Sequence, residues 1–261
     1  MRAFLHAPAL LLMLAACTAL VPRAESAMTP QPVEVMLVGD SLSVGPFGRA
    51  LEQALRARYG RRAVSVFASC GSSPEDWLPG QPVFVTNCGY RQSTPGGSFS
   101  REYENGKRPP PVKTPKLPTL LGHVRPRIVI VQLGTNWMDK LAAAPRLDGR
   151  TYRKFIRSFI AQLRRGPGPR PAIFWVMPPA SSKYPPAIHD AVERWIAEEA
   201  AALGFYTVDS RALTAPYRDG RTGGDGVHYG DAAGQRWARG VMGALGPALD
   251  RLSLAPRGAA R

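Results

Sequence analysis

Cysteine and histidine are both scarce in this sequence. Its 261 residues contain three cysteines, Cys17, Cys70 and Cys88, and four histidines. No cluster of these residues has the spacing of zinc ligands, so the sequence gives no support to a metal site. We therefore expect a protein that binds no metal and works without a cofactor.

Acidic residues are also few. Asp plus Glu number 19 against 34 Lys plus Arg, which gives a formal net charge of +15. Such a surplus favours anionic partners, either nucleic acid or the polymers of a cell surface. No nucleic-acid-binding motif is present, and the segment 151–165 carries much of the charge, where it fits the solvated face of a helix. We expect no nucleic-acid partner, and an anionic cell-surface polymer remains an alternative to an ordinary solvated surface.

Long apolar runs are absent beyond the N-terminus. The run "LLLMLAACTALV" is too short and too poorly flanked for a transmembrane helix, and it is typical of an export signal, here residues 1–27. Two processing sites fit this segment. "RAESA" ends in the small residues that a signal peptidase requires, whereas "LAAC" resembles a lipobox in which Cys17 would be acylated. We expect an exported protein, periplasmic or secreted, with a membrane anchor only if Cys17 is lipidated.

Export also bears on the two remaining cysteines. In an oxidising compartment we expect Cys70 and Cys88 to form a disulfide, with two free buried thiols as the alternative. Closing a loop of this length stabilises a fold by roughly 3 kcal/mol in the chain-entropy model.

Behind the signal, segments typical of strands alternate with segments typical of helices. Runs of β-branched and aromatic residues without clean polar alternation predict strands buried on both faces, at 33–38, 63–68, 127–133, 172–177 and 205–208. Apolar residues at helical spacing predict helices at 152–163, at 188–203 and from Asp231 to Leu245. This order predicts an α/β fold with a central parallel sheet and helices on both faces. We expect a single domain at 28–250, followed by a disordered tail at 251–261.

One segment interrupts the alternation. Residues 72–126 contain no convincing long element and include the basic, proline-rich "KRPPPVKTPKLP". A loop of this length in a compact domain is usually functional or disordered. Because no internal repeat and no second core is visible, we interpret it as an elaborated loop insertion.

The strand order brings distant polar residues together. Ser41 follows the first predicted strand, Gly71 the second and Asn136 the third, while Asp225 and His228 follow the last. The carboxyl ends of parallel strands meet at one edge of a sheet, which is where such sheets bind ligands. A hydroxyl, an imidazole and a carboxylate are the parts that an acyl-transfer site needs.

Of the four histidines, His228 is the one in position to act as a base. His6 lies in the signal segment, His123 at the end of the insertion and His189 on the predicted polar side of a helix. His228 lies in "GGDGVHYG", three residues after Asp225, so one turn can bring the imidazole to the carboxylate.

Four short blocks resemble the motifs of the SGNH (GDSL) hydrolases and occur in the same order. The resemblance covers the chain from about residue 33 to residue 245 and rests on "GDSLS" at 39–43, the glycine at 71, "GTN" at 134–136 and "DGVH" at 225–228. Each block alone is weakly specific, and the ordered set after successive strands is much more specific.

The resemblance implies a flavodoxin-like three-layer α/β/α fold. It implies that Ser41 is the nucleophile, His228 the base and Asp225 its orienting partner. It also implies an oxyanion hole made by the backbone N–H groups of Ser41 and Gly71 and the side-chain amide of Asn136. Taken singly, Ser41 would equally fit a helix N-cap.

The activity implied is that of an exported serine esterase. Its substrates would be small acyl esters, acetyl above all, on carbohydrate or cell-wall glycan. A glycan O-acyltransferase using the same residues and a non-catalytic cell-surface glycan-binding module are the alternatives. Trp137 and Tyr229, which flank predicted site residues, fit either contact with a ligand or packing.

Overall fold

The computed structural model describes residues 35–103, 106–144, 149–215 and 225–254. The predicted export signal, with Cys17, lies outside these residues. Of the helices described, none combines the length and the apolar character that a membrane span requires.

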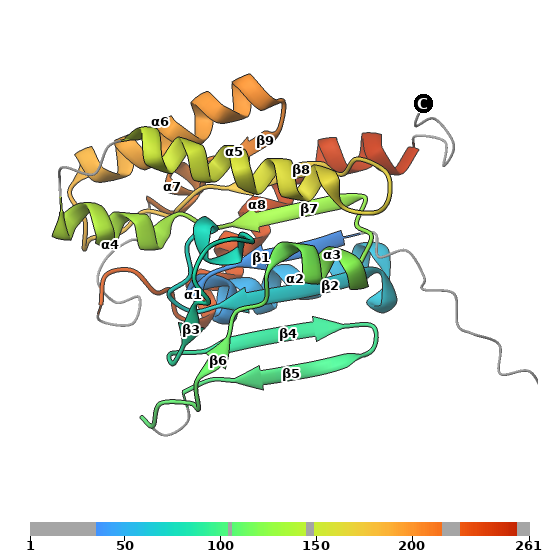
Figure 1. The fold of residues 1–261 in the computed structure, drawn as a ribbon, viewed down its shortest axis with the longest axis horizontal. Coiled ribbons are helices and arrows are strands. Elements are labelled where there is room, and N and C mark those ends of the chain that lie inside the picture. Colours follow the sequence, from blue (N-terminus) through green and yellow to red (C-terminus); the bar gives the residue numbers. More distant parts are fainter. Residues whose placement is uncertain (1–34, 104–105, 145–148, 216–224, 255–261) are drawn as a thin grey trace, which may run out of the picture. The chain divides into compact units, whose positions relative to one another are not determined.

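Seven of the described strands form one sheet, in the order β5-β4-β2-β1-β7-β8-β9 (Figure 1). The five predicted strands are all present and lie parallel to one another, each within about two residues of its predicted ends. Their bounds are β1 Val35–Gly39, β2 Val64–Ser69, β7 Ile128–Gln132, β8 Ala172–Val176 and β9 Tyr206–Val208.

The predicted central parallel sheet is present, and two antiparallel strands extend it at one edge. β4 (Tyr90–Thr94) runs antiparallel to β2, and β5 (Gly97–Arg101) runs antiparallel to β4. Both strands come from the predicted insertion, so this segment adds a hairpin to the sheet instead of forming only a loop. Every residue of β5 is exposed, which leaves no apolar alternation by which its sequence would predict a strand.

The insertion holds further short elements besides the hairpin. β3 and β6 pair as a separate antiparallel ribbon. Along the chain, the short helical turn η2 precedes these strands and helix α3 follows them. Their bounds are η2 Pro74–Trp77, β3 Val85–Thr86, β6 Val112–Lys113 and α3 Leu117–His123.

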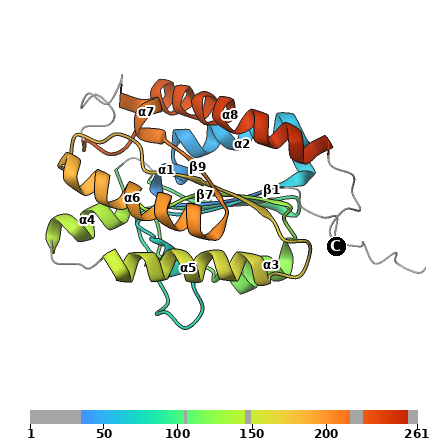
Figure 2. The same cartoon turned by 90° about the horizontal axis from the view of Figure 1, so that it is seen from above.

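Helices cover both faces of the sheet, as predicted (Figure 2). On one face lie α1 Ser41–Val44, α2 Pro46–Tyr59, α7 Ser210–Thr214 and α8 Asp231–Leu254, with η1 Arg61–Ala63 following α2. On the other face lie α3, α4 Thr135–Ala143, α5 Gly149–Arg165 and α6 Pro186–Leu203. Because α8 continues to Leu254, the tail predicted to begin at 251 was placed too early, and residues 255–261 lie outside the described part.

The burial of β1 shows why the protein has one hydrophobic core layer on each face of the sheet. All five residues of this strand are buried, and successive side chains enter opposite layers. Met36 and Val38 pack with the α3–α6 layer, whereas Val35 and Leu37 pack with the α2–α8 layer. A central strand covered on both faces therefore carries no polar alternation, and its carboxyl end is the part left open to a ligand.

Candidate active site

Ser41 lies at the carboxyl end of the central strand. β1 ends at Gly39, and Ser41 is the first residue of the short helix α1. Asp40 caps this helix, because its Oδ1 accepts a hydrogen bond from the Leu42 N–H at 3.0 Å. Gly39 permits the sharp entry, since a Cβ there would lie 2.0 Å from Ser43 Oγ. The cap is Asp40, so the structure does not use Ser41 as the N-cap and leaves it half-buried on the sheet edge.

Asp40 is a buried carboxyl group beside the predicted nucleophile. Burial raises its pKa to about 6, against the lowering effects of the Leu42 N–H bond and of His228. Gln132 and Thr135, also buried, act on the same carboxyl and lower its pKa to a smaller extent. Asp40 lies within "GDSLS", and its burial could not be predicted locally because it depends on residues more than ninety positions away, Gln132 and Thr135.

Asp225 and His228 are in direct contact. Asp225 Oδ2 lies 2.5 Å from His228 Nδ1, and Oδ1 accepts the N–H groups of Val227 and His228, both at 2.9 Å. Partial burial would raise the pKa of Asp225, but these hydrogen bonds outweigh it and lower the pKa to about 2. The carboxylate is therefore ionised at neutral pH and holds the ring through Nδ1, which leaves Nε2 for proton transfer.

The turn that carries this pair is held from the loop after β8. Gly226 has a φ of +74°, which favours glycine, and a Cβ there would lie 2.6 Å from Ser182 Oγ. Its carbonyl oxygen accepts hydrogen bonds from Ser181 Oγ at 2.6 Å and from the Ser182 N–H at 3.1 Å. The Asp225–His228 turn is thus tied to the sheet edge although both side chains are about half exposed.

Gly71 and Asn136 belong to two loops that are joined to each other. Gly71 follows β2 with a φ of +81°. Asn136 lies in the first turn of α4, and its Nδ2 donates a hydrogen bond to the Ser72 carbonyl oxygen at 2.9 Å. A disulfide links Cys70 to Cys88, with 5.6 Å between the two Cα atoms, and so fixes the residue before Gly71. The cysteines that the sequence analysis paired are therefore bonded in the structure.

The structure brings the predicted residues to one edge without a complete hydrogen-bonded triad. Within the described residues, no hydrogen bond joins Ser41 Oγ to the His228 ring. Hydrogen bonds of this kind are often long in an unliganded site and shorten when substrate binds. The described residues also include no group of three or more His, Cys, Asp or Glu side chains that could hold a metal ion.

Three further expectations have clear outcomes. Trp137 is fully buried and its Nε1 donates to Glu75 at 2.8 Å, so it packs inside the protein instead of facing a ligand. Tyr229 is buried too, and its hydroxyl donates to the Ala180 carbonyl oxygen. The expectation that His189 lies on a polar helix face was wrong. Its side chain is only 3% exposed and meets Tyr184 edge to face, because the loop before α6 covers it.

Comparison with known proteins gives matches in structure and none in sequence. No protein-family model and no curated protein sequence matches the chain. Three solved structures illustrate the structural matches. The peptidoglycan O-acetyltransferase catalytic domain of Streptococcus pneumoniae is 16% identical, with a TM-score of 0.51 over 84% of this chain and 96% of that one. The M. smegmatis aryl esterase is also 16% identical, with a TM-score of 0.54 over 82% and 99%. A carbohydrate acetylesterase of Sinorhizobium meliloti is 16% identical, with a TM-score of 0.53 over 82% and 99%.

Proposed function

We propose that this chain, which has the fold of the SGNH hydrolases, is a serine ester hydrolase with Ser41 as its nucleophile. The observation that carries the proposal is the contact of 2.5 Å between Asp225 and His228 at the sheet edge where α1 presents Ser41. A carboxylate that holds an imidazole in one orientation is the feature that activates a serine in such enzymes.

The proposed reaction has two steps. Ser41 Oγ attacks the acyl carbonyl carbon, and His228 Nε2 takes the hydroxyl proton and returns it to the departing alcohol. Water then attacks the acyl-enzyme, and His228 takes one proton from it and returns a proton to Ser41 Oγ as the acid leaves. Asp225 stays ionised throughout, as its pKa of about 2 requires, and stabilises the imidazolium that forms twice.

The negative charge on the tetrahedral intermediate needs hydrogen-bond donors. In the proposal these are the N–H groups of Ser41 and Gly71 and the second N–H of the Asn136 amide. The first N–H of that amide is already committed to the Ser72 carbonyl oxygen. Donors fixed before the reaction cost no reorganisation when the charge develops, which is why they contribute strongly to rate.

For the substrate, we propose small acyl esters, acetyl above all, on carbohydrate or cell-wall glycan. Support comes from the structural matches, which include an acetylesterase of carbohydrate and an acetyltransferase of peptidoglycan. The disulfide between Cys70 and Cys88 supports an exported, oxidising location. Because one match is an O-acetyltransferase, transfer of the acyl group to a glycan hydroxyl instead of water is the second candidate.

A short-chain aryl ester tests the proposal directly. Wild type should release the aryl alcohol, and Ser41→Ala should lose nearly all of this activity while remaining folded. Ser158→Ala, in α5 on the opposite layer, is the matched control and should behave as wild type. Normal activity in Ser41→Ala would remove the catalytic assignment and favour the glycan-binding module. Adding an acetylated donor with a glycan acceptor, and measuring free acetate against acetylated glycan, separates hydrolysis from transfer.

A further inference from the structure

We propose that Arg91, on the inserted β4–β5 hairpin, is a positioning residue that holds the helix beginning with Ser41. The proposal rests on the serine hydrolase function proposed above and assigns a role to a segment that the sequence analysis read as a loop.

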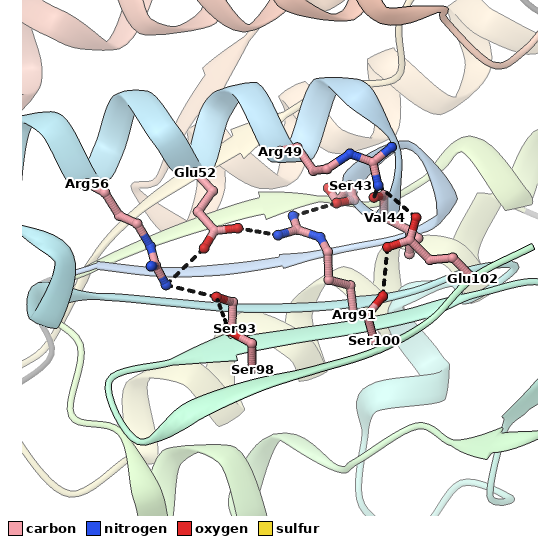
Figure 3. A network of polar contacts seen from close by, with 10 residues as sticks. All are labelled: Ser43, Val44, Arg49, Glu52, Arg56, Arg91, Ser93, Ser98, Ser100 and Glu102. Carbon is pink, nitrogen blue, oxygen red and sulfur yellow. Dashed lines mark hydrogen bonds and ion pairs between the residues drawn. The ribbon is translucent and has the colours of Figure 1, made fainter. Parts of the chain in front are cut away.

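Arg91 connects the hairpin to the end of α1 (Figure 3). Its Nη2 donates a hydrogen bond to the Ser43 carbonyl oxygen at 2.8 Å, while its Nη1 pairs with the Glu52 carboxylate of α2. The Arg91 side chain is only 8% exposed, and that of Glu52 is 11% exposed. A guanidinium held at two points in a buried setting has little freedom to move, so it fixes the carbonyl that it binds.

A second arginine makes the neighbouring contact. Arg49 Nη1 donates to the Val44 carbonyl oxygen at 3.3 Å and pairs with Glu102, just beyond β5, at 2.7 Å. The last two carbonyl groups of α1 therefore both accept a bond from an arginine. Such terminal carbonyls lack partners inside a helix and carry its negative pole, so two cations there stabilise a helix of only four residues.

The same hairpin is fixed to the other half of the candidate site. Cys88 forms the disulfide with Cys70, and the Cys70 N–H donates to the Gly89 carbonyl oxygen at 2.8 Å. The segment 88–91 thus spans the few residues between the loop of Gly71 and the helix of Ser41. In the proposed mechanism these two residues supply backbone donors to one oxyanion, so the hairpin sets the spacing between the donors.

The surrounding contacts make the role testable without loss of the fold. Glu52 also pairs with Arg56 at 2.9 Å, and Arg56 Nη2 donates to Ser93 Oγ of β4 at 2.8 Å. When Arg91 is removed, Glu52 keeps one cation and the hairpin keeps its strand pairing with β2. A matched control exists between α5 and α6, where Arg157 makes two hydrogen bonds of 2.7 Å to the buried carboxylate of Glu199.

The experiment compares Arg91→Met with Arg157→Met by steady-state kinetics and by hydrogen exchange of the α1 amides. Displacement of reacting groups by about 1 Å can reduce turnover by about 10², so Arg91→Met should lower kcat by about 10- to 100-fold with KM within about twofold. Exchange at residues 41–45 should become faster. Arg157→Met should leave kcat and this exchange unchanged. Arg91→Lys keeps the charge but not the two-pronged guanidinium, and its kcat should fall between wild type and Arg91→Met.

Several results would overturn the proposal. One is a kcat in Arg91→Met equal to that of Arg157→Met at equal folded fraction, because Arg91 would then be structural only. If Arg91→Met does not fold, Arg91→Met with Glu52→Gln removes the buried charge, and the same kcat and exchange criteria apply to it. If wild type hydrolyses no ester at all, the proposed function fails on its own. Hydrogen exchange in Arg91→Met then tests the positioning role on its own. Faster exchange at residues 41–45 supports the role, and unchanged exchange overturns it.

Discussion

Asn136 Nδ2 donates a hydrogen bond to the carbonyl oxygen of Ser72 at 2.9 Å across a sequence separation of 64 residues. The bond joins the start of α4, after β7, to the loop after β2. This hydrogen bond uses one of the two N–H groups of the Asn136 amide, and the second N–H takes no part in it. The residue thus combines a fixed orientation with a remaining donor, which is the combination that an oxyanion hole requires.

Asn136→Ala should therefore act on turnover more than on binding. Loss of one oxyanion donor typically lowers kcat by roughly 10² to 10³, and KM should change little. Asn136→Asp, of nearly the same size, should be at least as damaging because it presents a carboxylate where negative charge develops. Steady-state kinetics on an aryl acetate measure both. A large rise in KM at normal kcat would instead indicate a substrate-binding residue.

Ser41 and His228 should act as one unit. In the proposed mechanism neither helps without the other, so Ser41→Ala, His228→Ala and the double variant should all lose activity to about the same extent. Asp225→Asn should also be costly, since it removes the charge that holds the ring. A serine-reactive organophosphonate should label Ser41 in wild type, and it should label Ser41 much more slowly in His228→Ala. If the fold-loss of activity in the double variant equals the product of the two single losses, Ser41 and His228 do not act in a shared step.

Whether a feature of the fold or the site could be predicted depends on whether its cause lies in the neighbouring sequence or in packing between distant elements. The five parallel strands were predictable because burial on both faces leaves continuous apolar runs, as in β1. The contact between Asp225 and His228 was predictable because three residues, one turn, separate them, whereas their catalytic role with Ser41 stays a prediction. The β4–β5 hairpin was not, since all five residues of β5 are exposed and its single apolar side chain, Phe99, makes no alternating pattern; backbone pairing with β4 holds the strand.

Tertiary burial accounts for the other failures. His189 was expected on the polar side of a helix, and Glu199 interrupts the apolar stripe of the same helix, yet both side chains are buried. Glu199 is buried because Arg157 of α5 reaches it with two hydrogen bonds. Arg91 and Glu52 form a similar pair across 39 residues. Partners of this kind are set by packing between elements and leave no periodic signal in the sequence.

Asp40 should make stability depend on pH in an unusual direction. Its pKa rises from 3.8 to about 6 on burial, so the folded state binds a proton that the unfolded state has released. The free energy of unfolding should therefore fall as pH rises from about 4 to about 6. The difference between the two pKa values corresponds to about 3 kcal/mol, at about 1.4 kcal/mol per pKa unit.

Asp40→Asn isolates this effect because other titrating groups are common to both proteins. Urea unfolding at pH 4, 5, 6 and 7 should show the variant gaining stability relative to wild type as pH rises. A stability difference that is constant over this pH range would show that burial does not shift the proton affinity of Asp40.

Processing of the N-terminus is a separate prediction from the apolar run before residue 27. Mass spectrometry of protein recovered from the native host should find a first residue at about 17 or near 27. A diacylglycerol on Cys17 would identify a lipoprotein, and Cys17→Ser should then release the protein from the membrane. Exported material that retains Met1 would contradict the assignment of an export signal.

Removing the disulfide should affect both stability and turnover, because Cys70 directly precedes Gly71. The bond closes a loop with a sequence separation of 18, so Cys70→Ser with Cys88→Ser should lose roughly 3 kcal/mol of unfolding free energy in the chain-entropy model. Below the unfolding transition, the folded double variant should also show a lower kcat with KM nearly unchanged, since the Gly71 N–H loses a covalent anchor to the β4–β5 hairpin. Denaturant titration and kinetics on the same samples measure the two effects. Cys70→Ser alone and Cys88→Ser alone are the controls, because each breaks the disulfide while keeping one of the two cysteines. If the double variant loses stability but keeps wild-type kcat, the disulfide stabilises the fold without positioning the oxyanion loop.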